Sequence, residues 1–266
     1  MRIARFTTGE DYRFAVVQEA GDAGDGIEQL AVISADPLIA PITYTGEVVP
    51  LDDAVRLLAP VIPRSKVIGI GKNYVDHAAE MGSDVPEEPL AFLKPNTSVI
   101  GPGDPVVLPP QSAEVHYEGE LAVVIGRLCR DVPRERVAEV ILGYTCANDV
   151  TARDLQRKDG QWWRAKGFDT FCPLGPYLVT GLDLDTAGDL ALTTRRDGEV
   201  VQQARTSQMV FDIATLVVHV SSVMTLLPGD VILTGTPAGV GPVTAGQRVE
   251  VEIEGLGVLS NPMVRR

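Results

Sequence analysis

The stretch VHYEGELAVVIG, residues 115–126, joins an apolar strand pattern to a pair of closely spaced acids. Its second half, Leu121–Ile125, is continuously apolar, which predicts a strand in the core. Glu118 and Glu120 precede this half, and residues two apart in a strand point to the same face. Neighbouring carboxylates repel each other, and burial of either is costly unless another group compensates. The stretch therefore predicts either a solvated strand face or a cation-binding site beside the core.

Strand patterns dominate the rest of the chain. They are expected at Arg2–Thr7, Arg13–Gln18, Gln29–Ile33, Val67–Ile70, Ala91–Leu93, Val106–Leu108, Glu120–Ile125 and Arg248–Glu254, the last returning as a strand after a turn at 255–257. Helices are expected at Leu51–Leu58, Tyr74–Met81, about 131–141 and about 208–226, the last capped by Thr206 or Ser207. Strands and helices do not alternate regularly, which argues against a doubly wound sheet. The pattern predicts a strand-rich, mixed α+β fold.

The chain of 266 residues is long enough for a main domain with a smaller partner. The segment Ala59–Pro63 contains two prolines and reads as a linker. We therefore expect a small, β-rich N-terminal domain over residues 1–62 and a main domain over residues 63–266.

The net charge of −13 argues against nucleic acid or an anionic membrane as a partner, since both bind basic surfaces. An anionic small substrate is still allowed, because a local site can oppose the overall charge. Cys129, Cys146 and Cys172 are widely spaced and form no C-x-x-C pair, which favours a reducing compartment. No apolar run approaches the ~18 residues that span a bilayer, so we expect a cytoplasmic protein without a membrane partner.

A third carboxylate for a cation site is available in GYTCANDVTARDLQ, where an apolar stretch ends at Asn148 and Asp149. Glu118, Glu120 and Asp149 together would form an all-oxygen site, which suits Mg²⁺, Mn²⁺ or Ca²⁺ better than zinc. The alternative is that the glutamates lie on a solvated face and Asp149 caps a helix.

A second candidate site is GIGKNYVDHAAEMG. Gly69 and Gly71 suggest a dinucleotide-binding turn only weakly, because Tyr74 stands where the third glycine belongs. His77 and Glu80 would share a helix face, so the carboxylate could orient the imidazole as a general base. The alternative is an exposed His–Glu pair.

Two further segments could assist such a site. Lys166 in RAKGFDTFCPLGP could stabilise an oxyanion, or be an ordinary surface lysine. Thr236 in ILTGTPAGVGP could bind a carboxylate together with loop N–H groups, but no lysine is in position for a P-loop. His116 is a candidate for orienting the acids, and His219 is expected to be structural.

Six separated segments in this order resemble the fumarylacetoacetate hydrolase family: GKNYVDHAAEMG, FLKPNTSVIGPGDPV, VHYEGELAVVIG, GYTCANDVTARDLQ, KGFDTFCPLGP and LTGTPAGVGP. The resemblance implies a mixed β-sandwich roll, a homodimer and one divalent metal per active site. The oxygen ligands make Mg²⁺ the first choice for this metal, with Mn²⁺ or Ca²⁺ as alternatives. Residues 71–74 contain no acid where longer hydrolases acting on fumarylacetoacetate carry a further ligand. The chain therefore resembles the shorter members of the family.

The resemblance also assigns roles to individual residues. Glu118, Glu120 and Asp149 match the metal ligands. His77 and Glu80 match a catalytic pair on a lid that closes over the substrate, and Lys166 matches a lysine that stabilises an oxyanion. The positions that match substrate contacts or their neighbours are Tyr74, Arg153, Gln156, Thr170 and Thr236.

Such a site fits a small anionic 2-oxo or 2-hydroxydienoic acid, which can chelate the metal through its carboxylate and oxo oxygens. The first hypothesis is a hydrolase that cleaves a C–C bond of acylpyruvate-type substrates through a metal-bound enolate, with His77 activating water. The alternative is an isomerase or decarboxylase of the 2-hydroxyhepta-2,4-diene-1,7-dioate or oxaloacetate type. A different class, a non-catalytic protein that binds metal or small acids, is the third hypothesis.

Overall fold

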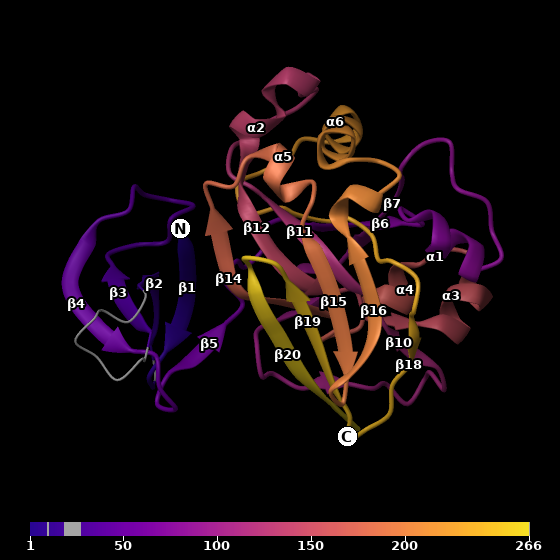
Figure 1. Cartoon of the computed structure of the whole chain (residues 1–266), viewed down its shortest axis with the longest axis horizontal. Helices are drawn as coiled ribbons and strands as arrows, with labels where there is room; N and C mark the ends of the chain where they lie inside the picture. The colour runs from indigo at the N-terminus through magenta and orange to yellow at the C-terminus, as the bar shows by residue number, and fades with distance from the viewer. Residues whose placement is uncertain (10, 19–27, 266) are drawn as a thin grey trace.

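The computed structural model describes residues 1–9, 11–18 and 28–265 and shows the predicted strand-rich α+β architecture (Figure 1). Over these residues the largest sheet has the strand order β4-β3-β2-β1-β14-β12-β11-β17-β6-β7, with β5 attached to β1 and β8 to β14. Its strands are β1 (Arg2–Thr7), β2 (Tyr12–Gln18), β3 (Gln29–Ile33), β4 (Tyr44–Pro50), β5 (Arg56–Leu58), β6 (Val67–Gly71), β7 (Leu90–Lys94), β8 (Val99–Ile100), β11 (Gly119–Ile125), β12 (Ile141–Asn148), β14 (Cys172–Thr180) and β17 (Val231–Leu233).

Two smaller sheets complete the strands of the described ranges. One has the order β16-β15-β19-β20-β9 and the other the order β13-β10-β18. Their strands are β9 (Val106–Val107), β10 (Val115–Tyr117), β13 (Thr151–Ala152), β15 (Ala191–Arg196), β16 (Glu199–Arg205), β18 (Gly241–Pro242), β19 (Arg248–Ile253) and β20 (Gly257–Val264).

The helices are short and gather in two places (Figure 1). Helices α2 (Val137–Val140), α5 (Leu184–Ala187) and α6 (Ile213–Val223) lie together at one end, at the top of the view. Helices α1 (Val75–Glu80), α3 (Arg153–Asp159) and α4 (Trp163–Lys166) lie on the side near β6 and β7. Short 3₁₀ turns occupy Asn96–Ser98, Arg134–Arg136 and Thr206–Gln208. In the described part of the chain, no helix has the length and apolar character needed to cross a membrane.

The five-stranded sheet packs on one face of the large sheet, with β20 against β14 and β19 against β12 (Figure 1). Alternate residues of β11 enter different cores: Leu121 and Val123 pack with α6 and β19, whereas Ala122 and Val124 pack on the opposite face. Strand β11 is therefore buried on both faces.

The N-terminal strands form a continuous sheet with the rest of the chain. Strand β1 pairs antiparallel with β14, with Ile3 opposite Leu178 and Arg2 opposite Val179. The predicted domain boundary at residue 62 therefore separates strands that belong to one hydrogen-bonded sheet. The division into two domains stays a prediction.

The helix predicted at Leu51–Leu58 is wrong. Asp52 begins a turn by accepting a hydrogen bond from the Ala54 N–H at 2.9 Å, and Arg56–Leu58 then forms β5. This strand pairs with β1, and Leu57 packs against the main core. Pairing with a distant strand outweighs the weak helix preference of so short a segment.

Two other predicted helices are shorter than expected. Helix α6 begins after Asp212, whose carboxylate accepts a hydrogen bond from the Thr215 N–H at 2.8 Å, so neither Thr206 nor Ser207 is its cap. His219 lies within this helix, as predicted. The helix expected over about 131–141 is reduced to a 3₁₀ turn followed by α2, because Ile141 begins β12.

Candidate active site

Strand pairing brings the three predicted metal ligands together. Glu118 lies between β10 and β11, and Asp149 follows β12 directly. Gly119 is opposite Asn148, and the Asp149 N–H donates a hydrogen bond to the Glu118 carbonyl at 2.9 Å. The side chains of Glu118, Glu120 and Asp149 each offer a carboxylate oxygen within 4.8 Å of the others, and these residues are 3%, 1% and 1% exposed. The alternative of a solvated strand face is wrong.

Gly119, between the two glutamates, permits this arrangement. A Cβ at this position would lie 2.1 Å from Thr194 Oγ1 of the facing sheet. The Gly119 N–H also donates to Gln202 Oε1 at 3.0 Å. Only glycine lets β15 and β16 approach so closely behind the acids.

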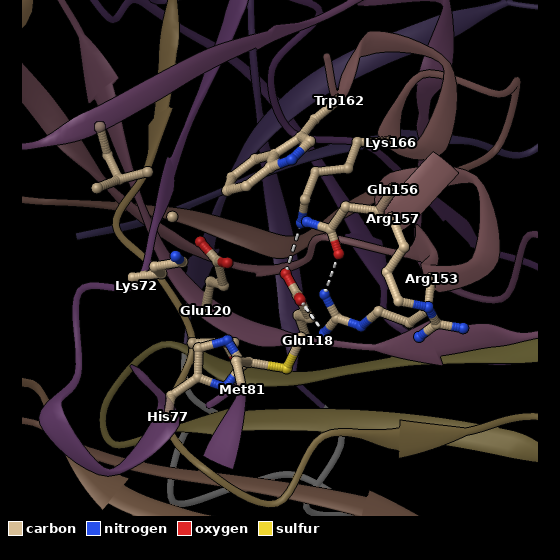
Figure 2. A pocket seen from close by; sticks show the side chains of 13 residues that line it. Lys72, His77, Met81, Glu118, Glu120, Arg153, Gln156, Arg157, Trp162 and Lys166 are labelled. Carbon is tan, nitrogen blue, oxygen red and sulfur yellow. Dashed lines mark hydrogen bonds and ion pairs between the residues drawn. The ribbon is translucent and has the colours of Figure 1, made fainter. Parts of the chain in front are cut away.

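Three cations balance the three carboxylates. Lys166 Nζ donates to Glu118 at 2.8 Å, to Asp149 at 2.6 Å and to Thr151 at 2.8 Å. Arg153 forms a buried ion pair with Glu118. Lys94, which no sequence pattern predicted, forms a buried ion pair with Asp149. Figure 2 shows Lys166 and Arg153 converging on Glu118. The buried cluster is therefore close to electrically neutral when all six groups are charged.

Glu120 differs from the other two acids. Burial raises its pKa well above the ordinary value, and the charges of Asp149 and Glu118 add to this effect. Its carboxylate accepts a hydrogen bond from the Gly235 N–H at 2.7 Å, and within the described residues no cation pairs with it. For Glu118, burial also opposes ionisation, but the charges of Arg153 and Lys166 outweigh burial and hold its pKa well below the ordinary value.

This donor set fits a hard divalent cation. All three groups are carboxylates, and Mg²⁺, Mn²⁺ and Ca²⁺ prefer oxygen ligands. Glu120 has no ion-pair partner within the described residues, so a bound cation would favour its ionised form. The residues present are thus suited to hold one of these divalent cations through Glu118, Glu120 and Asp149.

The predicted His–Glu pair lies on α1, beside the acids. His77 is buried, and its Nδ1 lies 3.2 Å from Glu80 Oε2. The Gly239 N–H donates to Glu80 Oε1 at 3.1 Å and so fixes the carboxylate from the other side. A carboxylate that holds Nδ1 leaves Nε2 available for proton transfer.

A pocket of about 200 Å³ is bordered by His77, Glu118 and Glu120. Its lining residues are Ile70, Gly71, Lys72, His77, Met81, Glu118, Glu120, Arg153, Gln156, Arg157, Trp162, Lys166 and Thr236, most of which are shown in Figure 2. Arg153 and Gln156 occur at the predicted site and contact each other, with Arg153 donating to Gln156 at 2.8 Å. Lys72, Arg157 and Trp162 were not predicted, because no local pattern distinguishes them from surface residues.

Other predicted substrate positions have different surroundings. Thr236 lines the pocket, but its hydroxyl donates to the Gly119 carbonyl at 2.9 Å and accepts from Gln202 at 2.8 Å. Tyr74 is buried, and within the described residues its hydroxyl has no hydrogen-bond partner. Burial and, less strongly, the charge of Glu120 raise the pKa of this hydroxyl.

Thr170 does not line this pocket. Its hydroxyl accepts a hydrogen bond from the Val107 N–H at 2.8 Å, and it borders a separate surface pocket with Phe168 and Arg265. His116, on β10, is paired through Nε2 with Glu114 at 3.2 Å rather than with the glutamates at the pocket.

The fold and this acidic pocket define a class of enzymes, and comparison with known proteins supplies its family. The family described as fumarylacetoacetate (FAA) hydrolase C-terminal matches residues 66–264, and the family described as Rv2993c-like, N-terminal matches residues 1–60. The chain belongs to the fumarylacetoacetate hydrolase family and is an enzyme.

Several relatives carry names that state an activity. A solved structure described as 5-carboxymethyl-2-hydroxymuconate delta-isomerase from Mycobacterium smegmatis is 52% identical, with a TM-score of 0.89 and 100% of both chains covered. A second, 2-hydroxyhepta-2,4-diene-1,7-dioate isomerase from Mycobacterium marinum, is 48% identical, with a TM-score of 0.89 and 100% and 99% coverage. Human mitochondrial oxaloacetate tautomerase FAHD2A is 49% identical over 219 residues, which are 79% of this chain and 70% of that protein.

Proposed function

We propose that the enzyme interconverts the enol and keto forms of a small 2-oxo or 2-hydroxydienoic diacid, with Mg²⁺ or Mn²⁺ bound by Glu118, Glu120 and Asp149. The observation that carries this proposal is the charge balance of the buried cluster. Its three carboxylates are matched by Lys94, Lys166 and Arg153, so a divalent ion would leave two uncompensated positive charges. A dianionic substrate would neutralise them, whereas a neutral ligand would not.

The residues around the pocket suggest how the ends of a diacid are held. Lys166 donates to three protein oxygens, so it has no N–H left for a ligand in this arrangement. Lys72 and Arg157 also line the pocket, and Arg157 pairs with Glu114 on the exposed side. We assign these two cations to binding of the substrate's carboxylates.

Proton transfer at the carbon next to the oxo group is assigned to His77. Glu80 holds its Nδ1, and the Gly239 N–H holds Glu80, so Nε2 can take and return a proton without a change in ring orientation. A divalent ion would act as a Lewis acid on the 2-oxo group. Arg153 and Lys166 keep Glu118 ionised and ready to bind this ion.

Hydrolysis of an acylpyruvate-type C–C bond is a second candidate, because the same His77–Glu80 pair could activate water instead. Decarboxylation would use the same substrate-binding groups. The names of the isomerase and tautomerase relatives favour proton transfer as the first candidate. Because the family consists of enzymes, the hypothesis of a non-catalytic binding protein is not supported.

A substrate panel tests the proposal. Oxaloacetate, 2-hydroxyhepta-2,4-diene-1,7-dioate and an acylpyruvate are each incubated in D₂O with Mg²⁺, Mn²⁺ or EDTA and followed by NMR. We expect metal-dependent deuterium exchange at the carbon beside the oxo group of the diacids, without carbon–carbon cleavage. Release of pyruvate from the acylpyruvate at a higher kcat/KM would replace the isomerase by the hydrolase. The homodimer is also a proposal, which light scattering in solution tests.

A further inference from the structure

We infer that Trp162 is a specificity-determining residue, an aromatic wall that favours planar, conjugated diacids over saturated diacids of the same length. This inference rests on the proposed function, because it names the substrate class of the same pocket. Trp162 lines the pocket together with Glu118, Glu120, Arg153 and Lys166. In Figure 2 its ring extends across the pocket from the side of Lys166, whereas His77 lies beyond the two glutamates.

Strand β6 is shaped to receive this ring. A Cβ on Gly71 would lie 2.6 Å from the Cζ3 atom of Trp162, closer than real side chains approach. A Cβ on Gly69 would lie 2.2 Å from the ring of Phe92, on the neighbouring strand β7. Gly69 and Gly71 therefore provide a flat surface for two aromatic rings. This packing accounts for the two glycines that weakly suggested a dinucleotide-binding turn.

The two rings support each other and the charged cluster. Phe92 and Trp162 pack edge to face with their centroids 5.5 Å apart and their planes at 67°. Lys166 Nζ lies 4.9 Å from the centroid of Phe92. Phe92 thus holds Trp162 in place and shields the lysine that binds Glu118 and Asp149.

This arrangement has a consequence for substrate choice. Much of the pocket lining is charged, and charged groups recognise the carboxylates at the ends of a diacid but not the carbon chain between them. An aromatic wall makes its largest contact with a flat, conjugated chain, which loses little conformational entropy on binding. A saturated chain of equal length and charge must be ordered first and meets the ring with less surface.

Calorimetry with Mg²⁺ tests the inference independently of turnover. The background is His77→Ala, so that the ligands are not converted. The probes are 2-hydroxymuconate, which is conjugated, 2-oxoadipate, which has the same length but is saturated, and oxalate, which has no chain. The variants are Trp162→Leu, Gly71→Ala, and Trp163→Leu as the matched control, since Trp163 is 64% exposed and does not line the pocket.

For Trp162→Leu we expect the Kd of 2-hydroxymuconate to rise about tenfold, that of 2-oxoadipate by less than about threefold, and that of oxalate by less than about twofold. Gly71→Ala retains the tryptophan but displaces its ring, so it should show the same order of effects. Trp163→Leu should change none of the three.

Two results overturn the inference. Equal weakening of all three probes in Trp162→Leu would mean that the ring only supports the metal site. Unchanged binding of 2-hydroxymuconate would mean that the wall does not contact the chain. Failure of the proposed function would give a different result. The wild-type enzyme would then show no deuterium exchange in the D₂O assay, and the dissociation constants of the three probes would not change.

Discussion

Replacement of Lys94 by methionine should destabilise the protein without metal and strengthen its binding of Mg²⁺. The side chain of Lys94 is 0% exposed and that of its partner Asp149 is 1% exposed. Removal of one member of a buried ion pair costs about 3–5 kcal/mol. Asp149 keeps its bond from Lys166 at 2.6 Å, and methionine retains the apolar stem. We therefore expect the low end of this range, a loss of about 3 kcal/mol in the free energy of unfolding in EDTA.

Metal should restore part of this loss. Without Lys94 the three acids face two cations, and one oxygen of Asp149 has lost its lysine. Both changes favour a divalent cation, so we expect the Kd for Mg²⁺ to fall about tenfold, which is about 1.4 kcal/mol. In excess Mg²⁺ the variant should then be less stable than the wild type by only about 1.6 kcal/mol.

Urea unfolding in EDTA and in Mg²⁺ measures both effects, and calorimetry gives the Kd directly. The matched control is Lys66→Met, which removes the Lys66–Asp230 pair with an N–O distance of 2.6 Å; none of the three acids pairs with Lys66. This control should lose the same free energy in both buffers. If Lys94→Met behaves like the control, or binds Mg²⁺ more weakly, the charge-balance reasoning is refuted.

Glu118→Ala should abolish Mg²⁺ binding in calorimetry, whereas Glu114→Ala should not. His77→Ala should keep Mg²⁺ binding and lower kcat by a factor of about 10²–10⁴. Because the pKa of Glu120 is raised, Mg²⁺ should compete with a proton for this carboxylate up to a higher pH than at an ordinary glutamate. Mg²⁺ affinity should therefore rise with pH, and titrations in buffers of different ionisation enthalpy should show proton release. Glu120→Gln should lose this pH dependence. Arg134 lowers the pKa of Asp212 to about 2, so the stabilisation from its carboxylate is present above pH 4 and is lost as pH falls toward 2. Asp212→Asn keeps a side chain that can cap the helix but has no charge to lose. The difference in free energy of unfolding between this variant and the wild type, measured by chemical unfolding, should therefore become smaller as the pH falls from 4 to 2.

The grouping of the three acids could be predicted because its signals are local. Spacing of two in a strand places Glu118 and Glu120 on one side, and the end of an apolar run places Asp149 at a strand end. Burial of all three follows from strand pairing, which also satisfies the backbone around them. The structure keeps both the glutamate spacing and the strand end, because no contact with a distant segment changes the conformation of these residues.

The cations of the site could not be predicted in the same way. Lys94 lies 55 residues from Asp149 in sequence, and its segment reads as an ordinary strand end. Likewise, Leu51–Leu58 has helical spacing, and only its partner β1 makes part of it a strand. Thr170 was proposed from its motif, but a motif does not say which way a side chain points, and this one bonds to the backbone of Val107.

The pairing of β1 with β14 has a consequence for handling the protein. Ile3 and Arg2 cover the backbone of Leu178 and Val179, and the terminal amino group of Met1 donates to the Thr180 carbonyl at 2.8 Å. A chain shortened to begin at β6 would leave this part of β14 as an open, apolar edge, the kind of surface on which strands of different molecules stack and precipitate. A purification tag fused directly before Met1 would disturb the same edge, so a fusion at the other end of the chain is the better choice for soluble material.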